Sequence, residues 1–191
     1  NIRNIPGGYH QTEGISYTDQ EWIFLPMATV SSIVYFDKIL YKYLIGRIGQ
    51  TMDNSQMIKN IWMEAKGEKI MIKSYKKLAA STLNKDDVYV RLKNRLNVIY
   101  RTCLINRKSG SFNLKEFDSW LKEVAPELYN YFGTICVNST KLGKSWPIVK
   151  LWRENKLYNN ILFRLWNYLH NKKLYRNSTT TQIVYFENNH Q

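Results

Sequence analysis

Beyond Met52, apolar residues recur every three to four positions, which is the spacing of one face of an α-helix. Four such stretches follow one another, separated by short polar connections: residues 58–77, 84–103, 113–132 and 145–169. We expect each to form amphipathic helix, and together to form a compact helical bundle. In the last stretch the residues predicted to face inward are Ile148, Leu151, Ile161, Leu162, Leu165 and Leu169.

The clearest helix start lies at Asn113. This residue can cap the first turn, Glu116 occupies the third helical position, and Phe112 can pack onto Phe117 as a hydrophobic staple. Pro126 then begins a further helical turn that should continue through Phe132.

The residues up to Met52 have a different character. Residues 33–36 and 39–45 are rich in β-branched and aromatic side chains, which is typical of short strands. The predicted fold is therefore mainly α, with a short two-stranded β element near residues 33–45 followed by an α-helical bundle. We place a domain boundary between residues 1–52 and 53–191. Residues 177–191 fit either a lone strand or a tail.

The net charge also changes at Met52, where the hydrophobic pattern changes. Lys and Arg exceed Asp and Glu by 28 − 15 = 13, and the whole excess lies beyond Met52. Basic residues alternate there with tryptophans and tyrosines, which suits an anionic membrane surface or, less well, nucleic acid. A solvated basic surface over an aromatic core is the third interpretation. Cys103 and Cys136 have no metal-ligand spacing and fit a cytoplasmic protein with reduced core cysteines.

The sequence leaves open whether an export signal once preceded Asn1. None is visible in the first residues, and no uninterrupted apolar run is long enough to span a membrane.

One short stretch, residues 13–26, suggests a catalytic site. Thr18 and Glu21 fit a capping box that begins a helix, and Pro26 should end or kink that helix after about two turns. Asp19 would then lie at the positive end of the helix dipole, where negative charge is favoured. We expect Trp22 to be a core residue.

Gly14, Tyr17, Thr18, Asp19 and Trp22, followed by residues 41–47 and 50–51, form a pattern over the first quarter of the chain. The pattern resembles the C-terminal half of the catalytic domain of bacterial family 2 glycosyltransferases, which have a GT-A fold. Thr18 departs from it, because the family usually has Glu there. The resemblance implies transfer of a sugar from a nucleotide-sugar donor to a glycan or lipid-linked acceptor, with inversion.

In that resemblance Asp19 is the general base that takes the proton from the acceptor hydroxyl. Arg47 would contact the donor diphosphate, and Tyr17, Glu21 and Gln50 would also bind substrate. The resemblance implies polysaccharide biosynthesis at the cell envelope, in the cytoplasm or peripherally at the inner face of the membrane.

The family's metal-binding pair of aspartates, separated by one residue, does not occur in this sequence. Neither does a strand–glycine–helix nucleotide cradle. We therefore expect a divalent metal, Mg²⁺ or Mn²⁺, only in a full-length enzyme of which this chain is the C-terminal part, inactive by itself. The alternative from another functional class is a non-enzymatic basic helical module that binds nucleic acid or an anionic membrane.

Overall fold

The computed structural model describes residues 11–42, 54–106, 112–135, 137–138 and 145–178, and these are mainly helical, as predicted. The helices are α1 (Asp19–Thr29), α2 (Asn54–Lys59), α3 (Ile61–Lys77), α4 (Lys85–Asn106), α5 (Leu114–Val124), α6 (Pro126–Thr134), α7 (Ile148–Arg153) and α8 (Ile161–Ser178). Two short antiparallel strands, β1 (Val137–Asn138) and β2 (Ser145–Trp146), pair with each other.

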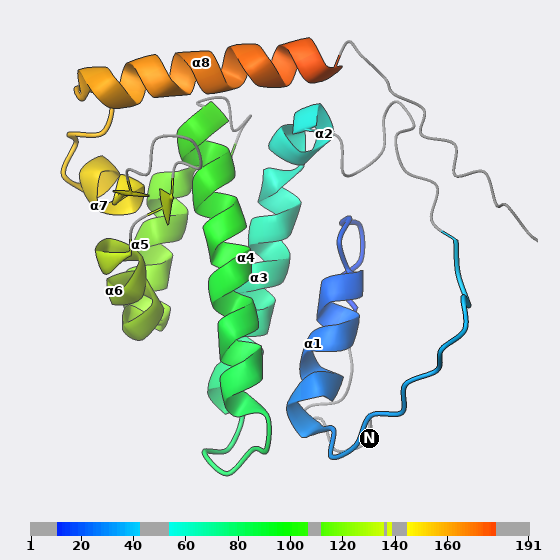
Figure 1. Cartoon of the computed structure of the whole chain (residues 1–191). Helices are drawn as coiled ribbons and strands as arrows, with labels where there is room; N and C mark the ends of the chain where they lie inside the picture. Colours follow the sequence, from blue (N-terminus) through cyan, green and yellow to red (C-terminus); the bar gives the residue numbers. More distant parts are fainter. Residues whose placement is uncertain (1–10, 43–53, 107–111, 136, 139–144, 179–191) are drawn as a thin grey trace, which may run out of the picture.

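A long antiparallel pair, α3 and α4, forms the centre of the molecule (Figure 1). Helix α1 packs against both on one side, and α5, α6 and α7 lie on the other side. Helix α8 runs across the end of the bundle at which α4 ends (Figure 1). The buried core is continuous from Phe24 in α1 through Leu96 in α4 to Phe163 in α8. The expected boundary after Met52 lies outside the described residues.

Helix α1 continues past Pro26 to Thr29, so of the two predicted effects of this proline, an end or a kink, the end is not found. Phe24 and Ala28, on either side of the proline, are completely buried, and this packing outweighs one missing helical hydrogen bond. The C-terminal end of α1 is held by a side chain from the connection between α3 and α4. There the Asn84 side-chain amide donates to the carbonyls of Met27 and Val30, at 2.9 and 2.6 Å.

The strand pair expected near residues 33–45 is not found in the described part of that range. Residues 33–42 contain neither helix nor strand and run away from the bundle (Figure 1), and residues 43–45 lie outside the described chain. A strand needs a neighbouring strand for its backbone hydrogen bonds, and none of the described residues supplies one. The segment carries seven large apolar side chains that are 66% to 85% exposed: Ile33, Val34, Tyr35, Phe36, Ile39, Leu40 and Tyr41.

Two helices, α7 and α8, take the place of the single long helix predicted after Pro147. A turn at residues 154–160 separates them, with Asn155 in the left-handed backbone region at φ 57°. The turn resets the helical phase, so that Phe163 and Asn167 become the buried positions of α8. Ile148 is buried in α7 as predicted, and Leu151 is half-buried. The inward orientation predicted for Ile161, Leu162, Leu165 and Leu169 is wrong, because all four are exposed.

The start of α5 is confirmed in detail. The Asn113 side-chain oxygen accepts hydrogen bonds from the backbone N–H groups of Lys115 and Glu116, at 3.2 and 3.3 Å. The rings of Phe112 and Phe117 lie 5.7 Å apart, centroid to centroid, as the predicted staple requires. Pro126 begins α6. The question of a strand or tail after residue 178 lies outside the described residues.

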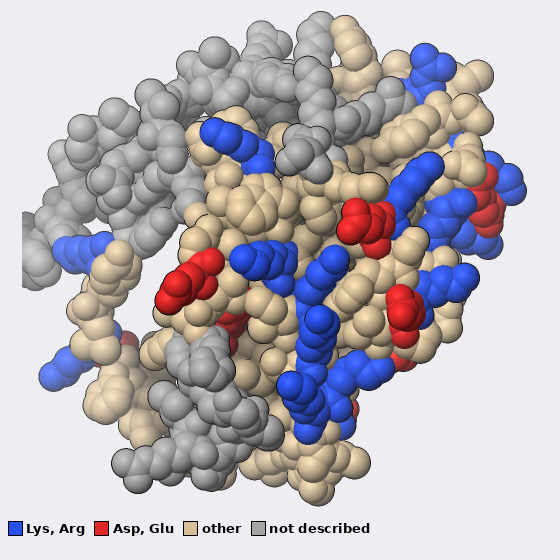
Figure 2. Space-filling model, turned by 180° about the vertical axis from the view of Figure 1, so that it is seen from behind, with Lys and Arg blue, Asp and Glu red and all other residues tan. Residues whose placement is uncertain are grey.

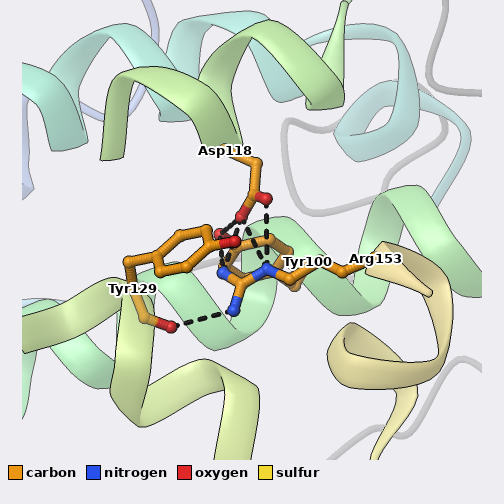
Figure 3. A network of polar contacts seen from close by, with 4 residues as sticks. All are labelled: Tyr100, Asp118, Tyr129 and Arg153. Carbon is orange, nitrogen blue, oxygen red and sulfur yellow. Dashed lines mark hydrogen bonds and ion pairs between the residues drawn. The ribbon is translucent and has the colours of Figure 1, made fainter. Parts of the chain in front are cut away.

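A polar network joins α5, α6 and α7 to the central helix α4 (Figure 3). Arg153 donates from Nε and Nη2 to the Asp118 carboxylate, with Nη2 at 2.7 Å from Oδ1, and from Nη1 to the Tyr129 carbonyl at 2.9 Å. The Tyr100 hydroxyl donates to the same carboxylate at 2.5 Å. Burial and the adjacent Asp118 charge strongly raise the pKa of Tyr100, so this tyrosine stays protonated.

Among the described residues, no helix has the length and apolar character needed to cross a bilayer.

Candidate active site

The turn that leads into α1 uses two left-handed backbone positions. Gly14 has φ +73°, which costs glycine little, and Tyr17 has φ 69°, which is strained for a residue with a side chain. Tyr17 is held there by its neighbours: its hydroxyl hydrogen-bonds the Asn60 side chain, and its carbonyl accepts from the Gln20 N–H at 3.1 Å. This turn places Asp19 as the first residue of α1.

Asp19 is exposed, and its carboxylate is held by a relay from α4. Arg91 Nη2 donates to the Gln20 side-chain oxygen at 2.8 Å, and Gln20 Nε2 donates to Asp19 Oδ2 at 3.0 Å. A second arginine, Arg95, is electrostatically coupled to this carboxylate. Burial lowers the pKa of Arg95, and the negative charge of Asp19 offsets part of that effect. Asp19 thus faces solvent, with one carboxylate oxygen hydrogen-bonded to Gln20 and with Arg95 near enough to interact electrostatically.

Trp22 lies one helical turn after Asp19 and is 59% exposed, so its predicted place in the core is wrong. The buried side of α1 is instead formed by Glu21, Phe24 and Ala28, which recur at helical spacing. Because residues three apart lie on the same side of a helix, Trp22 and Asp19 share the outer face.

The capping box predicted at Thr18 and Glu21 is absent, since Thr18 makes no side-chain cap hydrogen bond. Thr18 Oγ1 instead accepts from the Gln11 amide at 2.6 Å. Glu21 is buried, and its Oε2 accepts from the backbone N–H of Thr12 at 2.9 Å. Glu21 therefore fixes the chain that precedes the turn and does not cap the helix.

Beneath the turn, α1 crosses α3 at Gly67. A Cβ atom there would lie 3.2 Å from Glu21 Oε1, which is tighter than an ordinary contact. Glu64 in α3 forms an ion pair with Arg95. The space among these residues amounts to about 10 Å³, roughly the volume that one water needs. The turn before Asp19 is therefore packed closely against α3 and α4.

Tyr17, Asp19 and Glu21 all lie at this turn, with Asp19 exposed, Tyr17 half-buried and Glu21 buried. The predicted contact of Glu21 with substrate therefore conflicts with its burial against the chain that precedes the turn. Arg47 and Gln50, the predicted donor contacts, lie outside the described residues. Gln20 and Arg91 were not predicted from the sequence. Gln20 could have been suspected from its position next to Asp19, whereas no local pattern links Arg91 to this turn.

A larger hollow of about 480 Å³ lies elsewhere, between α4, α5 and α7. Its lining consists of Cys103, Leu104, Phe112, Asn113, Leu114, Lys115, Trp152 and Tyr158. Burial raises the pKa of Cys103 to about 12, so its thiol is a poor nucleophile at neutral pH. We therefore place the candidate active site at Asp19 and not in this hollow. In the described chain no three His, Cys, Asp or Glu side chains are grouped so that they could hold a metal ion.

Lysine and arginine side chains gather on one face of the molecule, with fewer acidic side chains between them (Figure 2). Several lysines of the bundle lie over aromatic rings. Lys69 Nζ is 5.0 Å from the centre of the Trp120 ring, and Lys93 Nζ is 4.9 Å from the rings of both Tyr89 and Tyr131. The alternation of basic and aromatic residues in the sequence therefore serves, in part, contacts within the fold.

Comparisons with protein-family models, curated proteins and solved structures found no match for this chain.

Proposed function

We propose that this chain is the acceptor-and-base part of an inverting glycosyltransferase. Asp19 removes the proton from an acceptor hydroxyl as that oxygen attacks the anomeric carbon of a nucleotide-sugar. The new glycosidic C–O bond forms while the bond to the nucleoside diphosphate breaks, and the diphosphate leaves with the electron pair. The proton ends on the Asp19 carboxylate.

The observation that carries this proposal is the relation between Asp19 and Trp22. An exposed, oriented carboxylate and an exposed indole lie one turn apart on the same side of α1. The flat apolar face of an indole suits the C–H face of a sugar ring, so that Trp22 can hold an acceptor sugar while Asp19 meets its hydroxyl. Glu21 supports the turn from within and does not contact the sugar.

The donor side is proposed to come from another part of a longer enzyme. In this proposal the exposed apolar segment 33–42 adds as a strand to the sheet of that part, which would satisfy its backbone and cover its side chains. Arg47 and Gln50 then face the donor diphosphate, and residues outside this sequence hold the divalent metal. The enzyme works at the inner face of the membrane on a glycan or lipid-linked acceptor.

The test is sugar transfer by the full-length parent enzyme carrying Asp19→Asn. We expect a loss of about 10²–10⁴-fold in kcat, because the amide cannot accept the proton. The matched control is Glu13→Gln, which removes an exposed acid from the same loop and should leave kcat unchanged. Undiminished transfer by Asp19→Asn would remove this residue from the mechanism.

A basic module for nucleic acid is the competing function, and the charged face in Figure 2 is the observation in its favour. Against it, the rings of Trp120, Tyr89 and Tyr131 already lie under lysines of this chain and so are not free to stack on bases. A gel shift with RNA and duplex DNA over a salt series distinguishes the two functions. Tight binding that weakens steeply with salt would favour the nucleic-acid module.

A further inference from the structure

Helix α8 exposes an apolar face. Five large apolar side chains on it are 56% to 77% exposed: Ile161, Leu162, Leu165, Tyr168 and Leu169. Their spacing of one, three and four residues places them on one side of the helix. The bundle therefore leaves an apolar stripe along the outer side of its last helix.

This stripe cannot turn inward, because the opposite side of α8 is already anchored. Phe163 is completely buried and packs against Tyr158, with ring centroids 6.2 Å apart, and the Tyr158 hydroxyl donates to the Leu104 carbonyl of α4 at 3.1 Å. Asn167 is also buried. The start of the helix is fixed as well, since the Asn160 side-chain oxygen accepts from the Phe163 N–H at 3.0 Å. Rotating the helix to bury the stripe would expose Phe163, so within the described part of the chain the stripe has no cover.

The net charge of the chain distinguishes among the partners that could cover the stripe. A second copy would bring together two chains of net charge +13, which repel each other. Nucleic acid would suit the charge but would offer little apolar surface to isoleucine and leucine. An anionic lipid surface offers both negative charge and an apolar interior. In the sequence of α8 the stripe is followed by basic residues, Lys172, Lys173 and Arg176.

The geometry points to α8 as an amphipathic helix that docks the protein onto an anionic lipid bilayer. The helix lies in the plane of the interface, with Leu162 and Leu165 inserted among the acyl chains and Tyr168 at the headgroup level. This matches its place across one end of the bundle (Figure 1). The inference stands apart from the sugar-transfer chemistry, because it depends on no residue of the Asp19 turn.

The experiment is flotation of the 191-residue chain with two kinds of vesicle, pure phosphatidylcholine and phosphatidylcholine containing about one third phosphatidylglycerol. We expect flotation with the anionic vesicles and little with the neutral ones, decreasing as salt is added. The variant Leu162→Gln/Leu165→Gln should bind at least about tenfold more weakly, since two inserted leucines are lost.

The matched control is Ile39→Gln/Leu40→Gln, which replaces two equally exposed apolar residues on another segment and should float like the original chain. Both variants should keep the original melting temperature, because the altered side chains are exposed. Asp19→Asn should also float normally, so a failure of the catalytic proposal would leave this result unchanged.

Three results would overturn the inference. The first is equal flotation by the α8 variant and the original chain, or equal loss in the α8 and control variants. The second is flotation that does not depend on anionic lipid. The third is a dimer, or a complex with RNA, that disappears only in the α8 variant, since the stripe would then be covered by protein or nucleic acid.

Discussion

Glu64 and Glu68 lie one turn apart on α3, and both are buried, yet only Glu64 has a charged partner, Arg95. Both carboxyl oxygens of Glu68 lack a hydrogen-bond partner within the described chain. Arg91, one turn before Arg95 on α4, donates to Gln20 in α1 and so serves the Asp19 relay. The Glu68 carboxyl is thus unpaired in the core, which is costly for stability.

Glu68→Met should stabilise the protein at neutral pH. Burial raises the pKa of Glu68 well above its ordinary value of 4.5, so the folded chain keeps a proton that the unfolded chain has lost. The stability contributed by this group therefore falls as the pH rises above 4.5. We expect the variant to raise the free energy of unfolding and to flatten its decline with pH, as measured by urea titration at several pH values.

Glu64→Met is the matched control on the same helix. It should destabilise the protein by about 3 kcal/mol, because it leaves Arg95 mostly buried without its counter-charge. If the two methionine variants changed stability alike, the contrast between the two glutamates would be wrong.

Gln20→Leu should slow sugar transfer by the full-length enzyme about tenfold to a hundredfold in kcat, with little change in KM. The leucine breaks the relay from Arg91, so that Asp19 loses its fixed orientation. Gln11→Leu, which removes another side-chain amide of the same turn, serves as the control. Because Arg91 acts through Gln20, Arg91→Met combined with Gln20→Leu should cost no more than either change alone. Additive losses would argue against the relay.

Trp22→Ala should raise the acceptor KM and leave the donor KM and the melting temperature unchanged. The exposed indole contributes little to the fold, whereas in our proposal it carries the acceptor sugar. Phe24→Ala, two residues later, should instead destabilise the protein by about 3–5 kcal/mol, since Phe24 is completely buried. Steady-state kinetics and thermal melts measure both. A large drop in melting temperature for Trp22→Ala would place this residue in the core after all.

Arg153→Met should destabilise the protein by about 3–5 kcal/mol, because it leaves the buried Asp118 carboxylate without its counter-charge. The acceptor KM should not change, since this network joins helices far along the chain from the Asp19 turn. Arg164→Met, at an exposed position of α8, is the control and should change stability little. Chemical denaturation compares the three proteins, and equal stability for all of them would show that the network is unimportant.

The sequence predicted those parts of the fold that are determined locally. The Asn113 cap, the Phe112–Phe117 staple and Pro126 all act within a few residues, and each was found where it was expected. The turn at residues 154–160 was missed because apolar residues continue at helical spacing across it. Once that turn shifted the phase of α8, the residues predicted to face inward became exposed.

In the candidate site, too, local features were predicted and contacts between distant residues were not. Asp19 was proposed from a pattern of neighbouring residues, and the helix start beside it was expected. The roles of Glu21 and Arg91 depend on contacts with residues distant in the sequence, so a local motif suggested a cap at Glu21 and gave no sign of Arg91. The exposed surface of Trp22 follows from which side of α1 meets α3 and α4, and this too is a property of the assembled bundle.

The local start signal of α5 also bears on the order in which the chain folds. A capped, stapled helix followed directly by α6 closes only short loops, so this hairpin is expected to form early. The turn before Asp19 is held by Asn60 and Met63 and can become ordered only after the central helices are in place. In the proposed function, the candidate base would therefore reach its position only late in folding.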